Sequence, residues 1–429
     1  MNLKKKLIYL LILLLVFPCI LSLSVVEANT ADIETYSPSC LLIDNKTGKI
    51  LYEKNAYEKR FPASTTKIMT AILALENCDL SEKATVSYNA IFSVPSGYAN
   101  ANLQLGEELT VEQLLYALLL PSANDAANVL AEHIAGSVES FSTMMNTKAA
   151  ELGCQNTHFV NPNGVQNEDH YSTAYDLSLI AQYAMKNPTF RTMIKTTTYT
   201  LPATNKYNNA DRVFATTNDL IRVNTKDRAD NYYYKYANGI KTGYTSEAKN
   251  CIVASATRDG LEFIAVVLGA GQTESGLSQR YLDCKTLFDY GFENYTIRKI
   301  KDKDSVLKQI KIDNATKETQ NADLLLQEEI TVLSEKNTDT DNLLPTITIQ
   351  DDLKAPLAKG TVVGSVTYEV LGVDYTTNLI LGENVEKSSL FIVLLRMLFI
   401  IIILFLVFKL VSRSQKKARR KRNYKRYKI

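Results

Sequence analysis

The segment FPASTTK places a serine and a lysine three residues apart, at Ser64 and Lys67. The apolar residues Ile68, Ile72 and Leu75 follow at helical spacing and predict a helix that begins near Ser64. On that helix Lys67 lies one turn from Ser64 on the same face, so its amine can approach the serine hydroxyl. A helix start also presents backbone N–H groups to developing negative charge. The pair therefore predicts a serine nucleophile with a lysine as its general base.

The base in such a pair must be neutral, because a protonated lysine cannot accept a proton. Removal of an amine from water and a second cation beside it both lower its pKa. The sequence offers Lys241 as that second cation. We therefore expect Lys67 to be buried near Lys241 and uncharged.

Ser64 and Lys67 form the first of three short motifs. The S-x-x-K motif is followed by S-x-N at Ser122 and Asn124 and by K-T-G from Lys241 onward, which is the order of a serine acyl-enzyme pattern. We expect Ser122 to relay a proton to the leaving amine. We expect Asn124 to hold the substrate amide.

The K-T-G motif supplies the remaining expected contacts. Lys241 with Thr242 is expected to bind a carboxylate, and Gly243 to let a substrate approach the strand. The backbone N–H groups of Tyr244 and Ser64 are expected to form an oxyanion hole. These residues complete the predicted substrate-binding set.

Each motif alone also has an ordinary structural explanation: a helix N-cap for Ser64, a loop serine for Ser122, a capping amide for Asn124 and a solvated turn for K-T-G. The motifs also occur elsewhere, as S-x-x-K from Ser246, Ser305 and Ser414, S-x-N from Ser87 and K-T-G from Lys46. Only one combination puts the first motif at a helix start, the second between helices and the third at the entry to a strand. That combination carries the prediction.

The surrounding patterns predict the elements that position these motifs. Residues 40–54 are two β-like runs around a polar turn, which is typical of a hairpin. Thr110 and Gln113 form a capping box ahead of an apolar helix that Pro121 ends. Residues 252–270 contain two continuously apolar strands around a turn, which indicates a sheet covered on both faces. The first domain is therefore predicted to be α/β (α+β), with an antiparallel hairpin in its sheet.

Several short β-like runs follow, and residues 297–387 are predicted to form a small all-β domain. The apolar run 390–411 has 22 residues, which reach roughly 33 Å as a helix and can cross a bilayer. Arg396 lies six residues inside this run, so its side chain can snorkel to the nearer interface. The run is therefore predicted to be a transmembrane helix.

The two ends of the chain predict its topology. Residues 1–28 contain three lysines, an apolar run and small residues at their end, which predicts a cleaved signal peptide; an uncleaved anchor is the alternative. The tail 412–429 contains ten basic residues, so it is expected to remain in the cytoplasm. The predicted protein is exported and held in the cell membrane by one C-terminal span, with its catalytic domain on the extracytoplasmic face.

The charge is distributed unevenly, although the whole chain carries a formal net charge of only +2. Between residues 29 and 387 there are 33 basic and 45 acidic residues, which gives this body a net charge of −12. A body with this charge does not favour nucleic acid as a partner. The positive charge belongs to the ends of the chain.

Cysteine and histidine residues indicate neither a disulfide framework nor a metal site. Five cysteines follow the signal peptide, with no C-x-x-C pair, and we interpret most of them as small buried apolar residues. His133, His158 and His170 have no ligand spacing. We expect His158 and His170, which flank an NPNG segment, to be structural. No metal and no cofactor are predicted.

Four segments give the sequence a specific resemblance: FPASTTKIMTA, LLLPSANDAANVLAEHIAGS, HFVNPNGVQNEDHYSTAYDL and NGIKTGYTSEA. They resemble the low-molecular-mass penicillin-binding proteins that are D-alanyl-D-alanine carboxypeptidases. The resemblance covers residues 36–295, and the β-rich region that follows is similar to the C-terminal domain of that family. It departs from the family at Ala248 and Lys249, where Ala-Gly is usual, and in an anchor that spans the membrane.

The resemblance implies a transpeptidase or serine β-lactamase-like domain, with an antiparallel sheet flanked by helices. It implies an acyl-enzyme on Ser64 that releases the terminal D-alanine of peptidoglycan stem peptides, and acylation of the same serine by penicillins and other β-lactams. A β-lactamase-like hydrolase is one alternative, although no E-x-x-L-N-like segment lies between Asn124 and Lys241. A non-catalytic protein that binds peptidoglycan or β-lactams is the other.

Overall fold

The computed structural model describes residues 33–209, 211–223, 232–340 and 342–426. The predicted signal peptide, residues 1–28, lies outside the described residues. Internal contacts divide the chain between Asn294 and Tyr295 into two compact units, which are taken in turn.

The first unit is built on an antiparallel sheet whose described strands run in the order β2-β1-β9-β8-β7. Their bounds are β1 Ser39–Asp44, β2 Ile50–Lys54, β7 Ala237–Thr245, β8 Lys249–Arg258 and β9 Leu261–Ala270. The predicted hairpin from residue 40 to residue 54 is confirmed as β1 and β2. The two apolar runs after residue 250 are confirmed as β8 and β9, which pair across the turn at Asp259.

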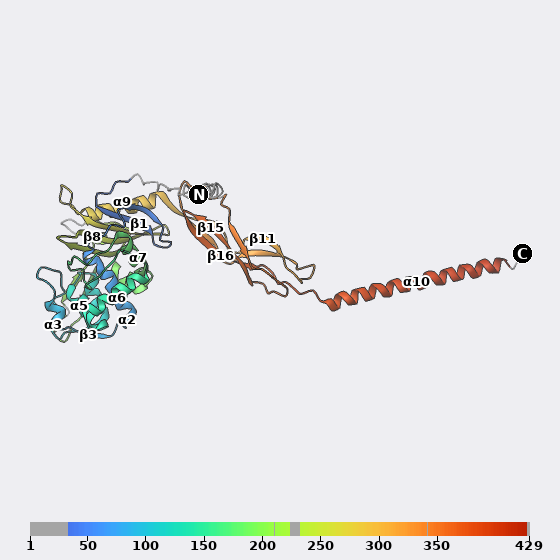
Figure 1. Ribbon diagram of the computed structural model, residues 1–429, viewed down its shortest axis with the longest axis horizontal. Helices are drawn as coiled ribbons and strands as arrows, with labels where there is room; N and C mark the ends of the chain where they lie inside the picture. Colours follow the sequence, from blue (N-terminus) through green and yellow to red (C-terminus); the bar gives the residue numbers. More distant parts are fainter. Residues whose placement is uncertain (1–32, 210, 224–231, 341, 427–429) are drawn as a thin grey trace, which may run out of the picture. The chain divides into compact units, whose positions relative to one another are not determined.

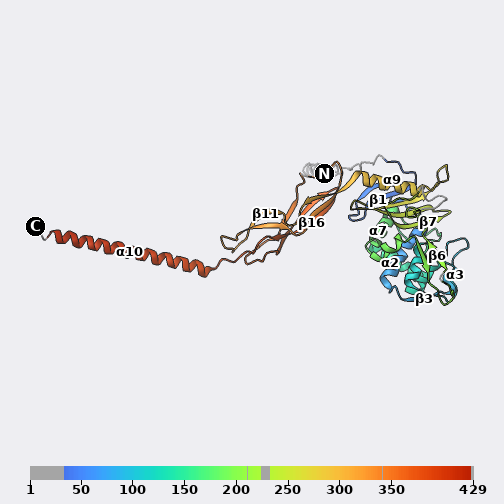
Figure 2. The ribbon, with the colours of Figure 1, turned by 180° about the vertical axis from the view of Figure 1, so that it is seen from behind.

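Helices cover both faces of this sheet, as the apolar strands predict. Helix α9 (Gln279–Asn294) packs on β8 and β9 from one side, and α7 (Ala174–Ala184) packs on β9 and β1 from the other. Figure 1 shows α9 on the opposite side of the sheet from α2, α5 and α6, and the reverse view in Figure 2 agrees. The strands between these layers are buried along most of their length, for example throughout β1.

The helical layer begins and ends where local sequence signals place it. Helix α4 (Val111–Leu119) starts at the predicted capping box, in which the Thr110 side chain accepts from the Gln113 N–H and the Gln113 side chain accepts from the Thr110 N–H. Helix α5 (Asn124–Ala135) ends at Gly136, whose φ of 79° is the left-handed conformation that glycine adopts without strain. The other helices of this layer are α2 Lys67–Asn77, α3 Tyr88–Phe92, α6 Val138–Glu151, α7 and α8 Pro188–Lys195.

Two short strand pairs complete the described part of the first unit. They are β3 Lys83–Thr85 with β4 Glu108–Thr110, and β5 Thr198–Leu201 with β6 Arg212–Ala215.

Four tyrosines, Tyr232, Tyr233, Tyr234 and Tyr236, precede the K-T-G motif; their strand propensity predicts a partly exposed strand, with a groove for glycan or peptide as the alternative. The structure has turns and irregular backbone at residues 232–236 instead. Tyr232 and Tyr234 are buried there, against Tyr281 and Phe288 of α9.

The second unit has an all-β core, as predicted. Strand β10 (Tyr295–Lys301) pairs with β13 (Ile330–Glu335), and a second sheet has the order β11-β12-β16-β15-β14. The bounds of that sheet are β11 Val306–Lys311, β12 Asn321–Leu326, β14 Thr346–Ile349, β15 Val362–Val370 and β16 Val373–Leu381. Alternate residues of β12, which are Ala322, Leu324 and Leu326, point into its apolar core.

One long helix, α10 (Leu390–Arg426), follows the second unit's strands. Among the described helices it is the one that contains a candidate membrane span, Val393–Arg420, with a mean hydropathy of 2.8. The helix continues beyond the end predicted at residue 411. Its basic tail is rich in Lys and Arg, which are good helix formers, and contains neither Gly nor Pro, so no breaker ends the helix there.

Candidate active site

Ser64 lies in a tight 3-10 turn (η2, Ala63–Thr66) that leads directly into α2. The sequence predicts a helix that begins near Ser64. In the structure the α-helix begins three residues later, with Lys67. The N-cap alternative for Ser64 is wrong, because Pro62 precedes the 3-10 turn and Thr66 precedes α2 in those positions. The N–H of Ser64 belongs to the first residues of the turn, which have no acceptor one turn back. It is therefore suited to bind an oxyanion.

Two glycines hold the Ser64 turn from opposite segments of the chain. A Cβ on Gly164 would lie 1.9 Å from the carbonyl oxygen of Ala63, and a Cβ on Gly243 would lie 2.9 Å from the Ser64 nitrogen. Ala63 itself has a φ of 47°, which is strained for a residue with a side chain. Gly243 was predicted to let a substrate approach the strand. In the structure it also lets the backbone of Ser64 approach the strand. Because neither glycine has a side chain, the NPNG loop and β7 can pack directly against the backbone of Ala63 and Ser64.

Lys67 is fully buried and its amine has three close oxygen neighbours. Its Nζ lies 2.9 Å from Ser64 Oγ, 2.7 Å from Asn124 Oδ1 and 2.6 Å from the carbonyl oxygen of Asn163. The last two oxygens can only accept hydrogen bonds. A neutral amine has two N–H donors and one lone pair, so the two acceptors use both donors. The lone pair is then directed at the Ser64 hydroxyl.

The electrostatics favour the neutral form of this amine. Burial, and then the nearby Lys241 cation, lower the pKa of Lys67 well below its ordinary value, while Asp125 acts in the opposite direction. Both causes are the ones that the sequence predicts. Geometry and charge together make Lys67 able to take a proton from Ser64.

Ser122 and Asn124 approach the same centre from the loop before α5. Ser122 has a φ of 67°, and its Oγ is buried without a hydrogen-bond partner in the described part of the chain. An unpaired buried hydroxyl is costly and is typical of a functional position. Asn124 is occupied differently: it receives the Lys67 bond through Oδ1 and donates through Nδ2 to the carbonyl of Ala99 at 2.8 Å. That its amide holds the substrate stays a prediction; in the structure the amide oxygen also contacts Lys67.

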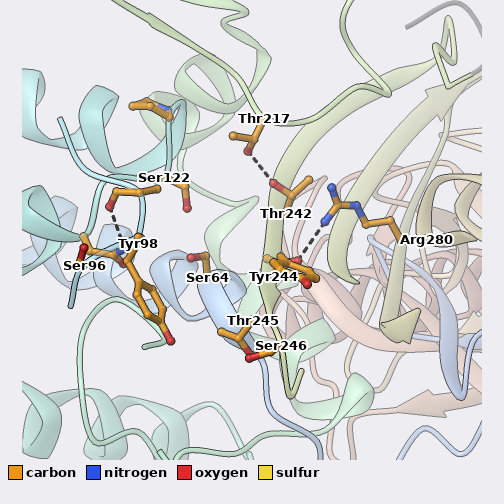
Figure 3. A pocket seen from close by; sticks show the side chains of 15 residues that line it. Ser64, Ser96, Tyr98, Ser122, Thr217, Thr242, Tyr244, Thr245, Ser246 and Arg280 are labelled. Carbon is orange, nitrogen blue, oxygen red and sulfur yellow. Dashed lines mark hydrogen bonds between the residues drawn. The ribbon is translucent and has the colours of Figure 1, made fainter. Parts of the chain in front are cut away.

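Strand β7 forms the other wall of the site. Thr242, Gly243 and Tyr244 line a cavity of about 470 Å³ together with Ser64 and Ser122. The side chain of Tyr244 is exposed to solvent at this wall. Figure 3 shows the Ser64, Ser122 and Thr242 side chains around a common space, with Tyr98 at its rim.

Lys241 is buried behind this wall rather than on it. Its Nζ donates to the carbonyl of Thr242 at 3.0 Å, and it is absent from the described lining of the cavity. Burial, and then the Arg280 cation, lower its pKa to about 7. The predicted contact of Lys241 with a carboxylate stays a prediction; in the structure its charge lies behind Thr242 rather than on the cavity wall.

Two residues beside Thr242 and Gly243, namely Thr217 and Arg280, were not predicted from the sequence. Thr217 Oγ1 lies 2.6 Å from Thr242 Oγ1, and Arg280 donates through Nη1 to the carbonyl of Gly243 at 3.0 Å (Figure 3). Both line the cavity. Hydroxyl groups beside a guanidinium form a site for a carboxylate. No motif marks either residue, because Thr217 is an isolated loop residue and Arg280 begins an otherwise ordinary helix.

Asn163 is the third residue missed, although the NPNG segment around it was noticed. Its contribution is a backbone carbonyl, which no side-chain pattern reveals. The loop is held to α2 by Thr70, whose Oγ1 donates to the Pro162 carbonyl at 2.5 Å. It is also held by His170, whose Nδ1 accepts from the Val160 N–H at 3.1 Å and whose Nε2 therefore donates to Thr66 Oγ1 at 2.8 Å.

These contacts give His170 a structural role, as predicted, and a testable consequence for acid stability. Burial lowers the pKa of His170 to about 3 from an ordinary 6.5. In the unfolded chain His170 binds a proton below about pH 6.5, whereas in the folded chain it binds one only below about pH 3. Stability should therefore fall as pH falls through this window, by about 1.4 kcal/mol per pH unit.

The measurement is the guanidinium chloride midpoint of the full-length protein in detergent between pH 7 and pH 4. His170→Gln should reduce its dependence on pH. An unchanged dependence in His170→Gln would contradict the assignment.

Comparisons with known proteins agree with this geometry. A family model described as D-alanyl-D-alanine carboxypeptidase matches residues 25–272, and one described as the C-terminal domain of penicillin-binding protein 5 matches residues 295–387. The chain is 32% identical over 375 residues to the D-alanyl-D-alanine carboxypeptidase DacF of Bacillus subtilis, which covers 86% of this chain and 90% of that protein. It is 28% identical over 376 residues to DacA of Escherichia coli K12, with 82% and 86% covered.

Solved structures of penicillin-binding proteins and of a DD-transpeptidase are similar to this structure. The peptidoglycan synthesis regulatory factor PBP3 of Streptococcus pneumoniae superposes with a TM-score of 0.70 at 26% identity, over 82% of this chain and 100% of that one. The DD-transpeptidase of Streptomyces K15 superposes with a TM-score of 0.54 at 38% identity, over 61% of this chain and 98% of that one.

Proposed function

The chain belongs to the D-alanyl-D-alanine carboxypeptidase family of serine peptidases, and on this premise we propose that Ser64 is the nucleophile that removes the terminal D-alanine from peptidoglycan stem peptides. The lone pair of Lys67 takes the Ser64 proton while Oγ attacks the carbonyl carbon of the last peptide bond. The oxyanion is bound by the N–H groups of Ser64 and Tyr244. Through Ser122, the proton that Lys67 took from Ser64 is passed to the leaving amine; D-alanine departs and Lys67 is neutral again.

The second half of the reaction restores the enzyme. Water attacks the ester on Ser64, and Lys67 again acts as the base. The C–O bond to Ser64 breaks, so the shortened peptide leaves as a carboxylate and Ser64 regains its proton. Until D-alanine departs, Thr217, Thr242 and Arg280 hold its carboxylate, which is the C-terminal carboxylate of the substrate. In a penicillin the cleaved amine stays tethered to the acyl group, so it cannot leave, and the adduct persists.

One observation carries this proposal: the buried amine of Lys67 lies within hydrogen-bond distance of Asn124 Oδ1, the Asn163 carbonyl and Ser64 Oγ together. A protein that only binds peptidoglycan does not need that arrangement. A β-lactamase of the kind that uses a glutamate to activate water needs an acidic residue in the cavity, and the described residues that line the cavity include neither Asp nor Glu.

The direct test is D-alanine release from a diacyl-Lys-D-Ala-D-Ala peptide by the full-length protein in detergent. Release is expected, and prior incubation with penicillin should abolish it for hours after free penicillin is removed. Rapid recovery with hydrolysed penicillin in solution would favour the β-lactamase alternative. Penicillin binding without any D-alanine release would favour the non-catalytic alternative.

The charge of Lys241 predicts how this activity depends on pH. Its pKa of about 7 means that the amine is charged below pH 7 and neutral above it. Once neutral, it neither attracts the substrate carboxylate nor disfavours the charged form of Lys67. We therefore expect kcat/KM for D-alanine release to fall as pH rises above about 7.

Lys241→Met should lower kcat/KM at pH 6 by roughly tenfold or more, since a nearby charge contributes about 1 to 4 kcal/mol. It should also remove the decline above pH 7. Lys249→Met, which changes an exposed lysine on the next strand, is the control. A decline above pH 7 that persists unchanged in Lys241→Met would assign the ionisation to another group.

The proposal includes the cellular location and the domain limits. Residues 1–28 act as the signal peptide, 36–295 as the catalytic domain, 297–387 as the β-rich domain, 390–411 as the membrane span and 412–429 as a cytoplasmic tail. One apolar helix with a basic end supports this topology. The catalytic domain is then on the extracytoplasmic face, where stem peptides are found.

Protease added to intact spheroplasts should digest the catalytic domain and leave a tag at the C-terminus protected. A chain that ends at Lys387 should be released from the membrane fraction. Protection of the catalytic domain in sealed spheroplasts would contradict the proposed topology.

A further inference from the structure

A group of potential metal ligands lies outside the catalytic cavity in the part of the chain that the structure describes. It consists of Cys78, Glu82 and His133, whose sulfur, carboxylate oxygen and imidazole nitrogen all lie within 4.8 Å of one another. The sequence does not predict this group, because His133 is far from the other two in the chain. The fold brings them together at the end of α2, in the loop that follows it and in the last turn of α5.

The three residues are held by backbone structure. Cys78 is the C-cap of α2, where the helical backbone ends in an extended conformation. The Glu82 carbonyl accepts from the Val111 N–H at 2.8 Å, and the Glu82 carboxylate accepts from the Asp79 N–H at 3.3 Å. The same carboxylate lies 3.2 Å from His133 Nε2. Ligand positions fixed in this way lose little freedom when an ion binds.

The surroundings allow an ion to enter from solvent. The side chain of Glu82 is 46% exposed and that of His133 is 22% exposed, while Cys78 is half-buried. An ion at this point would have three protein ligands and room for water as a fourth. Three ligands plus water is a coordination that zinc commonly adopts in proteins.

Cys78 and His133 lie at the C-terminal ends of α2 and α5, and these two helices also carry Lys67 and Asn124 of the catalytic site. Helix α2 begins with Lys67 and ends at Cys78, and α5 begins with Asn124 and has His133 in its last turn. Their first residues are joined by the Lys67–Asn124 hydrogen bond of 2.7 Å. The helices therefore run in the same direction, and the cluster lies where their far ends meet.

From this arrangement we propose that Cys78, Glu82 and His133 bind one Zn²⁺ ion that joins the far ends of α2 and α5. Sulfur, imidazole and carboxylate together suit zinc, whereas calcium and magnesium take oxygen ligands. In a tetrahedral zinc site neighbouring ligand atoms are about 3.3 to 3.8 Å apart. Glu82 and His133 lie 3.2 Å apart, just below that range, and the Cys78 sulfur lies within 4.8 Å of both ligand atoms, so the ligands would need to move by about 1 Å or less to reach this geometry.

Binding is a proton exchange and involves no redox change. The Cys78 thiol releases its proton to solvent as the Zn–S bond forms, and neutral His133 donates its lone pair to the ion. The ion takes no part in the chemistry at Ser64. Its effect is to stabilise the folded catalytic unit, because the ligands are brought together only in the folded chain.

The test uses Co²⁺ as a spectroscopic substitute for Zn²⁺, added to the full-length protein in detergent with a phosphine reductant. We expect one Co²⁺ per chain, with the charge-transfer band of a sulfur–cobalt bond and the visible bands of tetrahedral cobalt. Added Zn²⁺ should displace the cobalt and raise the Tm. Cys78→Ser should abolish the charge-transfer band, and His133→Gln should weaken binding at least tenfold.

Cys154→Ser is the matched control, since Cys154 is the other half-buried free cysteine and should leave every signal unchanged. Penicillin acylation of each variant shows that its catalytic unit is folded. The proposal is overturned if folded wild-type protein gives no sulfur–cobalt band, if the band survives in Cys78→Ser, or if Zn²⁺ raises the Tm of Cys78→Ser as much as that of the wild type.

Discussion

Replacement of Ser64 with alanine is expected to abolish both D-alanine release and acylation by penicillin. The variant lacks the atom that forms the ester, so the rate should fall by roughly 10⁶-fold, as in serine peptidases that lose their nucleophile. Folding should be retained, because among the described residues the Ser64 hydroxyl has, besides Lys67, only a long contact of 3.5 Å to the Asn163 carbonyl. Release of D-alanine and the intact mass after incubation with penicillin measure the two effects.

The chain contains its own control for this experiment. Ser305 begins another S-x-x-K segment, with Lys308 in the third following position, and it lies in the second unit outside the catalytic cavity. Ser305→Ala should behave as the wild type. Residual acylation in Ser64→Ala at a wild-type rate would move the nucleophile elsewhere.

Replacement of Lys67 with methionine is expected to lower the rate of acylation by roughly 10² to 10⁴, the usual contribution of a positioned general base. Ser64 remains, so the loss should appear in kcat and in the rate of penicillin acylation. The buried acceptors on Asn124 and Asn163 also lose their donor, which should reduce stability by about 1 to 3 kcal/mol. Stopped-flow acylation and a denaturant titration separate the two effects.

Lys67→Arg distinguishes a base from a positioning residue. Arginine can donate to both acceptors, but it stays protonated and cannot take the proton of Ser64. A base role predicts that Arg restores no more activity than Met. Restoration of activity near the wild-type rate in Lys67→Arg would show that the residue acts by position alone. Lys308→Met is the control for loss of a lysine from an S-x-x-K segment.

Local patterns predicted much of the fold because each had a local physical cause. The hairpin of β1 and β2, the capping box at Thr110 and the strands around Asp259 all depend on neighbouring residues. The fold class was confirmed for the same reason. The extra K-T-G at Lys46 lies in the turn of that hairpin, where Thr47 bonds to Asp44.

The features that were missed depend on residues distant in the chain. One acceptor of Lys67, the carbonyl of Asn163, comes from the NPNG loop, about a hundred residues later, as does the close contact of Gly164 with the Ala63 backbone. Arg280 is brought to β7 by the packing of α9 on the sheet. A sequence pattern records which residue types are present at which spacing, and it does not record these approaches.

The prediction of a strand at residues 232–236 was wrong for a related reason. Its tyrosines have high strand propensity, which predicts a strand. In the structure, burial of Tyr232 and Tyr234 against α9 decides the conformation instead. Tertiary packing overrides local propensity when it buries two aromatic rings.

The central claim is that Ser64, activated by Lys67, is the residue that is acylated. It is tested most directly by locating the penicillin adduct in a tryptic digest of the full-length protein. Trypsin cuts after Arg60 and Lys67, so Ser64 lies in the short peptide FPASTTK. Fragmentation should place the added mass of one penicillin on Ser64. An adduct on another residue of that peptide or elsewhere in the chain, or no adduct on folded protein, would contradict the account.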